Sequence, residues 1–178
     1  MRKIVIAVLA LAATSACADS TTTSAPPNAK AVAPAPAPRA QQACDLLTPD
    51  TISSVLGAKV EAGEQIGFEC TFRKPASPQG MRQLAVRLRM EISDGTPDAV
   101  MDRFKATMRQ GLRGPYDPES VIGVGDVAAW DGDTMVAGKA IAGSKSAFLL
   151  VQLSEVNPAD EQRLARDLLS EAISKVRG

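Results

Sequence analysis

The three cysteines, Cys17, Cys44 and Cys70, carry the most reactive side chains of this 178-residue sequence, which contains no histidine. Without histidine, neither Ser-His-Asp nor Cys-His catalysis can be assembled, and a His-ligated metal site is excluded as well. Two cysteines without histidine cannot complete the four-ligand shell of a zinc site. The chemistry of the cysteines is therefore sought in modification and in disulfide formation.

The N-terminus has the parts of a secretory signal: Arg2 and Lys3, an apolar run at residues 4–13, and small residues after it. The run is shorter than the roughly 20 residues of a transmembrane helix. Residues 13–17 (ATSAC) resemble the lipobox of bacterial lipoproteins, although Thr14 stands where leucine is usual. This implies that residues 1–16 are a signal peptide and that Cys17 is lipidated. The alternative is an ordinary signal, cleaved after Ala16 or Ala18.

Export places the other two cysteines in an oxidising compartment. If Cys17 carries lipid, Cys44 and Cys70 remain as one pair, which accounts for the odd number of cysteines in an exported chain. A bridge between them would stabilise the fold by about 3.5 kcal/mol in the chain-entropy model. We therefore predict a Cys44–Cys70 disulfide.

Three carboxylates, Asp126, Asp131 and Asp133, lie close together in the sequence. Such groups can form a glycosidase pair or a calcium site. Residues 131–133 (DGD) also match a hairpin turn, where Asp and Gly serve the backbone conformation. The turn is the interpretation that we favour.

A second group of residues could form a binding surface. Arg82, Arg87 and Arg89 lie on or near one face of an expected strand, where they could bind an anion or a partner. An exposed strand face that discourages edge association is the favoured alternative. Tyr116 and Trp130 flank loops and could add to a recognition surface or simply pack.

Methionines are numerous for a chain with few aromatic residues, and they could line an adaptable apolar pocket or fill the core. We favour filling. The methionines concerned are Met81, Met90, Met101, Met108 and Met135.

Low complexity marks the chain from residue 18 to about residue 42, which is rich in Ala, Pro, Ser and Thr. Such a segment cannot bury enough apolar surface to offset its ordering entropy, and alternating Ala-Pro favours extended polyproline II. We expect residues 17–42 to be the lipidated cysteine with a disordered tether, and residues 43–178 to be one globular domain. The chain has 20 Lys and Arg and 20 Asp and Glu, so it lacks the basic footprint of a nucleic-acid-binding protein.

Three helices are expected, because capping side chains precede a proline three times, at Thr48, Thr96 and Asn157. The first should end at Gly57. Apolar residues recur at helical spacing in the second, from Val100 to Leu112, and in the third, from Leu164 to Val176.

Strands are indicated between these helices by alternating or continuous apolar residues, at about 68–72, 84–92, 127–130, 135–141 and 147–153. The last is apolar on both faces, so we expect it at the centre of the sheet. Hairpin strands with helices between them predict a single α+β domain, with an antiparallel sheet of about five or six strands packed with three helices.

Several short segments resemble a family of small actinobacterial lipoproteins that is defined as a domain of unknown function. They are residues 44–48 (CDLLT), 55–57 (VLG), 69–72 (ECTF) and 123–128 (GVGDVA). The resemblance implies an α+β domain with a Cys–Cys bridge, similar to sensor or accessory domains outside the membrane. It carries over no catalytic residues, and Phe72 stands where the family often has tryptophan.

We therefore expect a monomeric, lipid-anchored protein on the extracytoplasmic side, either on the outer face of the cytoplasmic membrane or in a periplasm. Its expected function is that of a non-enzymatic binding or accessory module without a cofactor, whose partner is a protein or a small ligand and not nucleic acid. The first alternative is a carrier of an apolar small ligand such as a lipid, with a cavity formed by the sheet and the Met-bearing second helix. The second alternative is a carboxylate-based enzyme. The binding residues that we single out are Arg87, Arg89, Tyr116 and Trp130.

Overall fold

A computed structural model describes residues 40–75 and 84–177, within one compact unit, Arg39–Gly178. The expected signal peptide, the lipidated Cys17, most of the tether, Met81 and Arg82 lie outside the described residues. Within the described ranges, none of the helices combines the length and the apolar character needed to span a bilayer.

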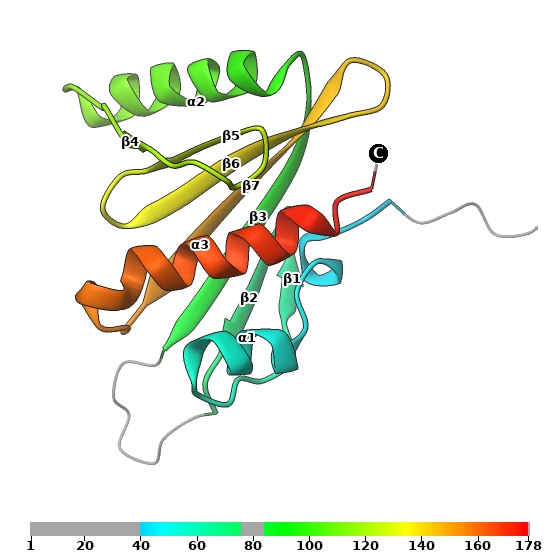
Figure 1. The fold of residues 1–178 in the computed structure, drawn as a ribbon, viewed down its shortest axis with the longest axis vertical. Helices are drawn as coiled ribbons and strands as arrows, with labels where there is room; N and C mark the ends of the chain where they lie inside the picture. Colours follow the sequence, from blue (N-terminus) through cyan, green and yellow to red (C-terminus); the bar gives the residue numbers. More distant parts are fainter. Residues whose placement is uncertain (1–39, 76–83, 178) are drawn as a thin grey trace, which may run out of the picture. The chain divides into compact units, whose positions relative to one another are not determined.

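One antiparallel sheet organises the domain (Figure 1), with the strand order β1-β2-β3-β7-β6-β5-β4. The strands are β1 (Glu64–Ile66), β2 (Glu69–Arg73), β3 (Ala85–Asp94), β4 (Glu119–Ser120), β5 (Val127–Trp130), β6 (Thr134–Ile141) and β7 (Lys145–Ser154). The α+β class and the central place of β7 are confirmed. The sheet has seven strands rather than five or six, because two very short edge strands, β1 and β4, lack an apolar pattern that the sequence could reveal.

The helices begin where the sequence predicts them. They are α1 (Pro49–Leu56), α2 (Pro97–Leu112) and α3 (Pro158–Ser174), and a short 3-10 helix, η1 (Ala43–Asp45), precedes them. The side chains of Thr48, Thr96 and Asn157 each accept a hydrogen bond from a backbone N–H of the first turn. Gly57 ends α1 with φ 63°, a conformation that costs glycine little.

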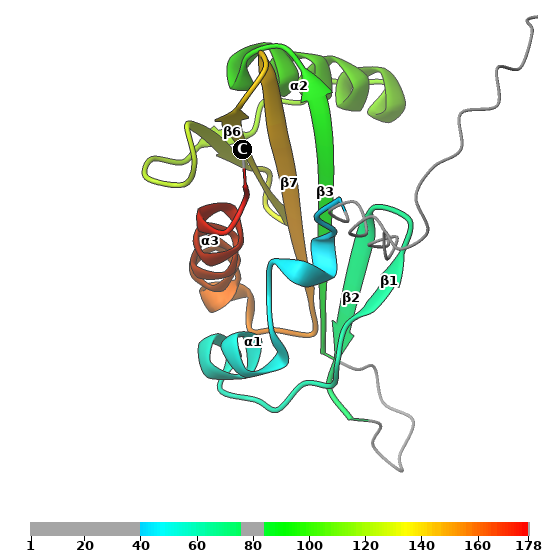
Figure 2. The same ribbon diagram turned by 90° about the vertical axis from the view of Figure 1, so that its right-hand side faces the viewer.

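The two faces of the sheet are covered differently (Figures 1 and 2). Helices α1 and α3 lie on one face, here called the α3 face, and α2 lies on the other, the α2 face. The main core fills the α3 face, where Leu168 and Leu169 of α3 are fully buried together with Leu88 and Val151 of the sheet. A smaller cluster forms beneath the N-terminal half of α2. The α2 face is therefore only partly covered.

The predicted disulfide joins η1 to the sheet. Cys44 and Cys70 are bonded with their Cα atoms 5.1 Å apart, and Cys70 is fully buried. The backbone N–H of Cys44 donates to Oε1 of Gln65, 2.9 Å away on β1. The bridge and this hydrogen bond fasten the start of the domain to the β1–β2 hairpin.

The glycine-rich segment before β5 has a structural role. Val124 is buried, and the Asp126 carboxylate accepts a hydrogen bond of 2.7 Å from the backbone N–H of Ala140 on β6. Gly125 has φ 61°, and a Cβ there would lie 2.6 Å from both the Gly138 carbonyl O and Ile173 Cδ1. Only glycine fits this close approach of the loop to β6 and α3.

Candidate functional site

Helix α2 packs on the sheet mainly through its first turns. Val100 and Met101 are buried against β5, β6 and β7, whereas Phe104 and Met108 are half-buried and Leu112 is 59% exposed. The apolar stripe predicted for this helix is therefore only partly used for packing. Its C-terminal half remains accessible from solvent.

A groove, here called the α2 groove, opens between this half of α2 and the sheet, with a volume of about 470 Å³. Its lining residues are Arg89, Glu91 and Ser93 of β3, Val100, Arg103, Phe104, Thr107 and Met108 of α2, and Phe148 and Leu150 of β7. The rings of Phe104 and Phe148 lie 5.2 Å apart between centroids and supply aromatic surface. The volume falls within the range of about 300–1,000 Å³ that is typical of small-molecule sites.

Charged and hydroxyl groups surround this apolar interior. Arg89 and Glu91 form an ion pair along β3. A guanidinium nitrogen of Arg103 donates to the Asp94 carbonyl O at 2.7 Å, which holds that side chain beside the end of β3. The groove thus combines apolar lining with two guanidinium groups, an arrangement that suits an amphipathic ligand with an anionic head.

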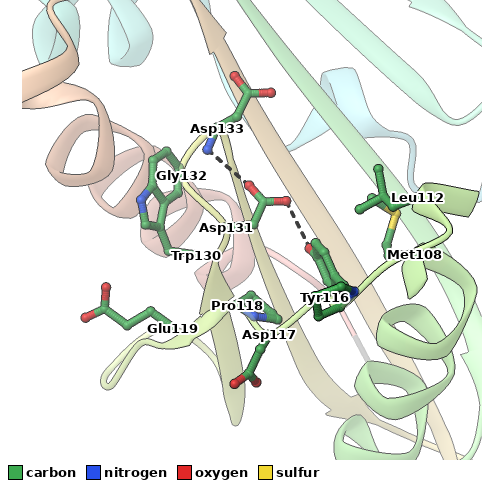
Figure 3. Close-up of a pocket in the computed structure, with 11 residues that line it drawn as sticks. Met108, Leu112, Tyr116, Asp117, Pro118, Glu119, Trp130, Asp131, Gly132 and Asp133 are labelled. Atoms are coloured by element: carbon green, nitrogen blue, oxygen red, sulfur yellow. Dashed lines mark hydrogen bonds between the residues drawn. The ribbon is translucent and has the colours of Figure 1, made fainter.

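A second hollow, the Tyr116 depression, shares Met108 with the α2 groove. It has a volume of about 590 Å³. Figure 3 shows the side chains that line it. It is lined by Met108, Leu112, Pro115, Tyr116, Asp117, Pro118, Glu119, Trp130, Asp131, Gly132 and Asp133. The Tyr116 hydroxyl donates to Asp131 Oδ2 at 2.9 Å, and its ring meets Phe104 edge-on at 6.0 Å. Tyr116 therefore supports one wall of the α2 groove through Phe104.

The carboxylates of this region stabilise turns. Oδ1 of Asp131 accepts hydrogen bonds from the backbone N–H groups of Asp133 and Thr134, at 3.0 and 2.7 Å. Oδ2 of Asp133 accepts a hydrogen bond of 2.6 Å from Nε2 of Gln152. Residues 131–133 form the β5–β6 turn, with Gly132 at φ 101°. Within residues 40–75 and 84–177, no three Cys, Asp or Glu side chains are grouped so as to hold a metal ion.

The four residues singled out from the sequence do not form one surface. Arg89 lines the α2 groove, and Tyr116 and Trp130 line the depression. Trp130 also packs against the main core, whereas Tyr116 contacts Phe104 of α2. Arg87 is exposed on the open part of the α2 face, opposite Thr71 and Gln152, and lines neither hollow.

The described methionines mostly fill space. Met90 and Met135 are buried in the main core, and Met101 of α2 is buried in the smaller cluster. Of these four methionines, only Met108 lines the two hollows. A cavity between the sheet and the Met-bearing second helix was predicted for the carrier alternative, but of the residues that line the groove only Arg89 was singled out as a binding residue. One signal was present: β7 is apolar on both faces, so its second face requires cover by the second helix.

Tyr116 has a testable titration. Burial raises the pKa of its phenol, and the hydrogen bond to Asp131 and the negative charge of that carboxylate raise it further. The folded protein favours the neutral phenol, so this contact stabilises the fold fully below the ordinary tyrosine pKa of about 10. The stabilisation is lost as the pH rises through the pKa of Tyr116 in the folded protein. Tyr116 is the chain's one tyrosine, so the ultraviolet absorbance of tyrosinate reports this group directly.

We expect the folded protein to form tyrosinate only well above a pH of about 10, and Asp131→Asn to lower the transition toward the ordinary value. Circular dichroism at each pH would show whether the chain is still folded. A wild-type phenol that titrates near its ordinary pKa in the folded protein would contradict the contact between Tyr116 and Asp131.

Comparison of the chain with family models, curated protein sequences and solved structures gives no significant match.

Proposed function

We propose that this chain is an exported, lipid-anchored protein whose domain acts outside the cytoplasm as a non-enzymatic binding module, with the α2 groove as its ligand site. The observation that carries the proposal is the incomplete cover of the α2 face. Phe148 is buried in the small cluster beneath α2, and the half-buried Phe104 and Leu150 pack against that cluster and line an accessible groove. An accessible apolar groove with a few polar groups at its edge is the usual form of a small-molecule site.

The lining favours one form of this function, a carrier of a small amphipathic molecule with an acyl chain. Phe104, Phe148 and Leu150 offer apolar contact along the groove, and each buried CH₂ of a ligand contributes about 0.8 kcal/mol. Arg89 and Arg103 at the edge suit a carboxylate or phosphate head. Glu91, which pairs with Arg89, would keep the guanidinium oriented in the absence of ligand.

The test is a titration with cis-parinaric acid, a fluorescent fatty acid, against the wild type and two helix variants. Thr107 is exposed on α2 and lines the groove, so Thr107→Trp places an indole in the ligand's space. We expect the Kd to rise about tenfold or more, the equivalent of about 1.4 kcal/mol.

The matched control is Ala106→Trp, at the adjacent and exposed position of α2 that is not part of the groove lining. It should leave the Kd unchanged. Titration with the corresponding fatty alcohol separates the head group from the chain, because Arg89→Ala should weaken binding of the acid and not of the alcohol. Saturable binding that is equal in both tryptophan variants would place the ligand elsewhere and refute the groove as the site.

A further inference from the structure

Large apolar side chains are exposed at the end of the domain where the described chain begins. Phe68 lies in the β1–β2 turn and is 67% exposed. Ile66, before the turn, is equally exposed, but it pairs with Glu69, the partner of Arg89, so its side chain lies toward the α2 face. The Phe68 carbonyl accepts the N–H of Met90, so the turn lies beside β3 two residues before Ile92. Ile92 is 48% exposed although the alternation of β3 places it on the α3 face with the buried Leu88 and Met90. The α3 face is therefore uncovered at Ile92, whereas the neighbouring Met90 and Ala147 are buried.

Two exposed basic residues belong to the same end of the domain, Lys145 by its strand register and Arg177 by its backbone hydrogen bond to Gln41. Lys145 is the first residue of β7 and is exposed. It lies two residues before Ala147, the partner of Ile92. Arg177, at the end of the described chain, is exposed as well. Asp94 lies opposite Lys145 and offsets part of its charge. We define the entry surface by Phe68, Ile92, Lys145 and Arg177.

The chain enters the domain at this surface. Gln41 Nε2 donates to the Lys175 carbonyl, and Gln41 Oε1 accepts the N–H of Arg177, so the two ends of the described chain are joined. Helix η1, which follows directly, packs against β1, β2 and β3 (Figure 2). Residues 18–39, between the proposed lipidated Cys17 and the described domain, therefore connect to the domain beside the exposed apolar groups.

We propose that the entry surface docks on the head-group region of an anionic phospholipid bilayer. The inference rests on the lipid anchor of the proposed function and is independent of the α2 groove. Apolar side chains flanked by cations are the chemistry that binds such an interface, where the apolar groups enter by about 5–10 Å. A tether gives the domain an effective concentration in the millimolar range at the membrane. A surface with only modest intrinsic affinity for lipid is then docked on the bilayer most of the time.

The experiment places a tryptophan in the entry surface of the full exported chain. Vesicles of equal parts phosphatidylglycerol and phosphatidylcholine are then added. Their acyl chains carry bromine atoms near the head groups, which quench tryptophan fluorescence. Phe68→Trp should shift its emission to shorter wavelength and lose most of its intensity to the bromines, after subtraction of the wild-type spectrum that Trp130 contributes. The control is Leu112→Trp, 59% exposed at the far end of α2, which should remain unquenched.

Charge reversal tests the cations. Lys145→Glu with Arg177→Glu should lower the ratio of docked to free domain by about five-fold per residue, the equivalent of about 1 kcal/mol for each cation. Lys59→Glu with Arg113→Glu, two exposed residues outside the surface, should leave it unchanged. The mass of the N-terminal peptide of the same sample shows separately whether Cys17 carries lipid.

If that mass includes lipid and the Phe68→Trp variant is as little quenched as the Leu112→Trp variant, the entry surface does not dock. If it shows no lipid, the anchor proposal fails, and quenching by a high concentration of added vesicles still decides the surface. A blue shift of the Phe68→Trp variant that grows with protein concentration in the absence of vesicles would mean that a second copy covers the surface, and would overturn the proposal.

Discussion

Replacing both Cys44 and Cys70 by alanine should lower the free energy of unfolding by about 3.5 kcal/mol. The bridge spans a sequence separation of 26 residues, and releasing a loop of that length increases the entropy of the unfolded chain by the corresponding amount. The loss should be large relative to total stability, because domains of this size are stable by only about 5–15 kcal/mol. Urea unfolding followed by circular dichroism measures it.

Reduction of the wild type supplies the control. A reducing agent should bring the wild type close to the double variant and should leave the double variant unchanged. The α2 groove contains neither cysteine, so ligand binding below the unfolding transition should be preserved. A loss of less than about 1 kcal/mol on substitution would contradict a structural role for the bridge.

The second large effect is expected at Gly125. Gly125→Ala forces a side chain into φ 61°, which costs about 1–2 kcal/mol, and drives its Cβ to 2.6 Å from the Gly138 carbonyl, where overpacking costs about 1–3 kcal/mol more. We therefore expect a loss of about 2–5 kcal/mol in the free energy of unfolding.

Gly123→Ala is the matched variant two residues earlier. Gly123 also has positive φ, at 85°, but a Cβ at this position would meet only the flexible Arg166 side chain, whose Nη2 would lie 3.5 Å away. The variant should lose only the backbone cost of about 1–2 kcal/mol. Equal losses in the two variants would contradict the close approach of Gly125 to β6.

The elements that the sequence predicted well are those with local signals. Capping residues before prolines located α1, α2 and α3, and period-two alternation located β3, because these features depend on neighbours in the chain. The Cys44–Cys70 bridge followed from cysteine arithmetic. Strands β1 and β4 were missed because edge strands of three and two residues carry no pattern of their own and depend on their partners.

The candidate site was predicted only in part: a cavity between the sheet and the second helix belonged to the carrier alternative, but its lining residues did not. Arg89 was identified as a charged residue on a strand, but the groove around it exists because α2 leaves part of the sheet uncovered. That depends on how far a helix diverges from a sheet, which Phe104 and Met108 do not reveal by their spacing. Tyr116 and Trp130 were rightly placed near loops, yet they contact different parts of the molecule, Phe104 of α2 in one case and the main core in the other.

The most direct test of the binding module is native mass spectrometry of the wild type, Thr107→Trp and Ala106→Trp, each incubated with a mixture of fatty acids and lysophospholipids. We predict a complex of one ligand with one chain for the wild type and for Ala106→Trp, with little or none for Thr107→Trp. The added mass would identify the preferred ligand. A bare chain in all three samples, or the same complex in all three, would contradict the α2 groove as the ligand site.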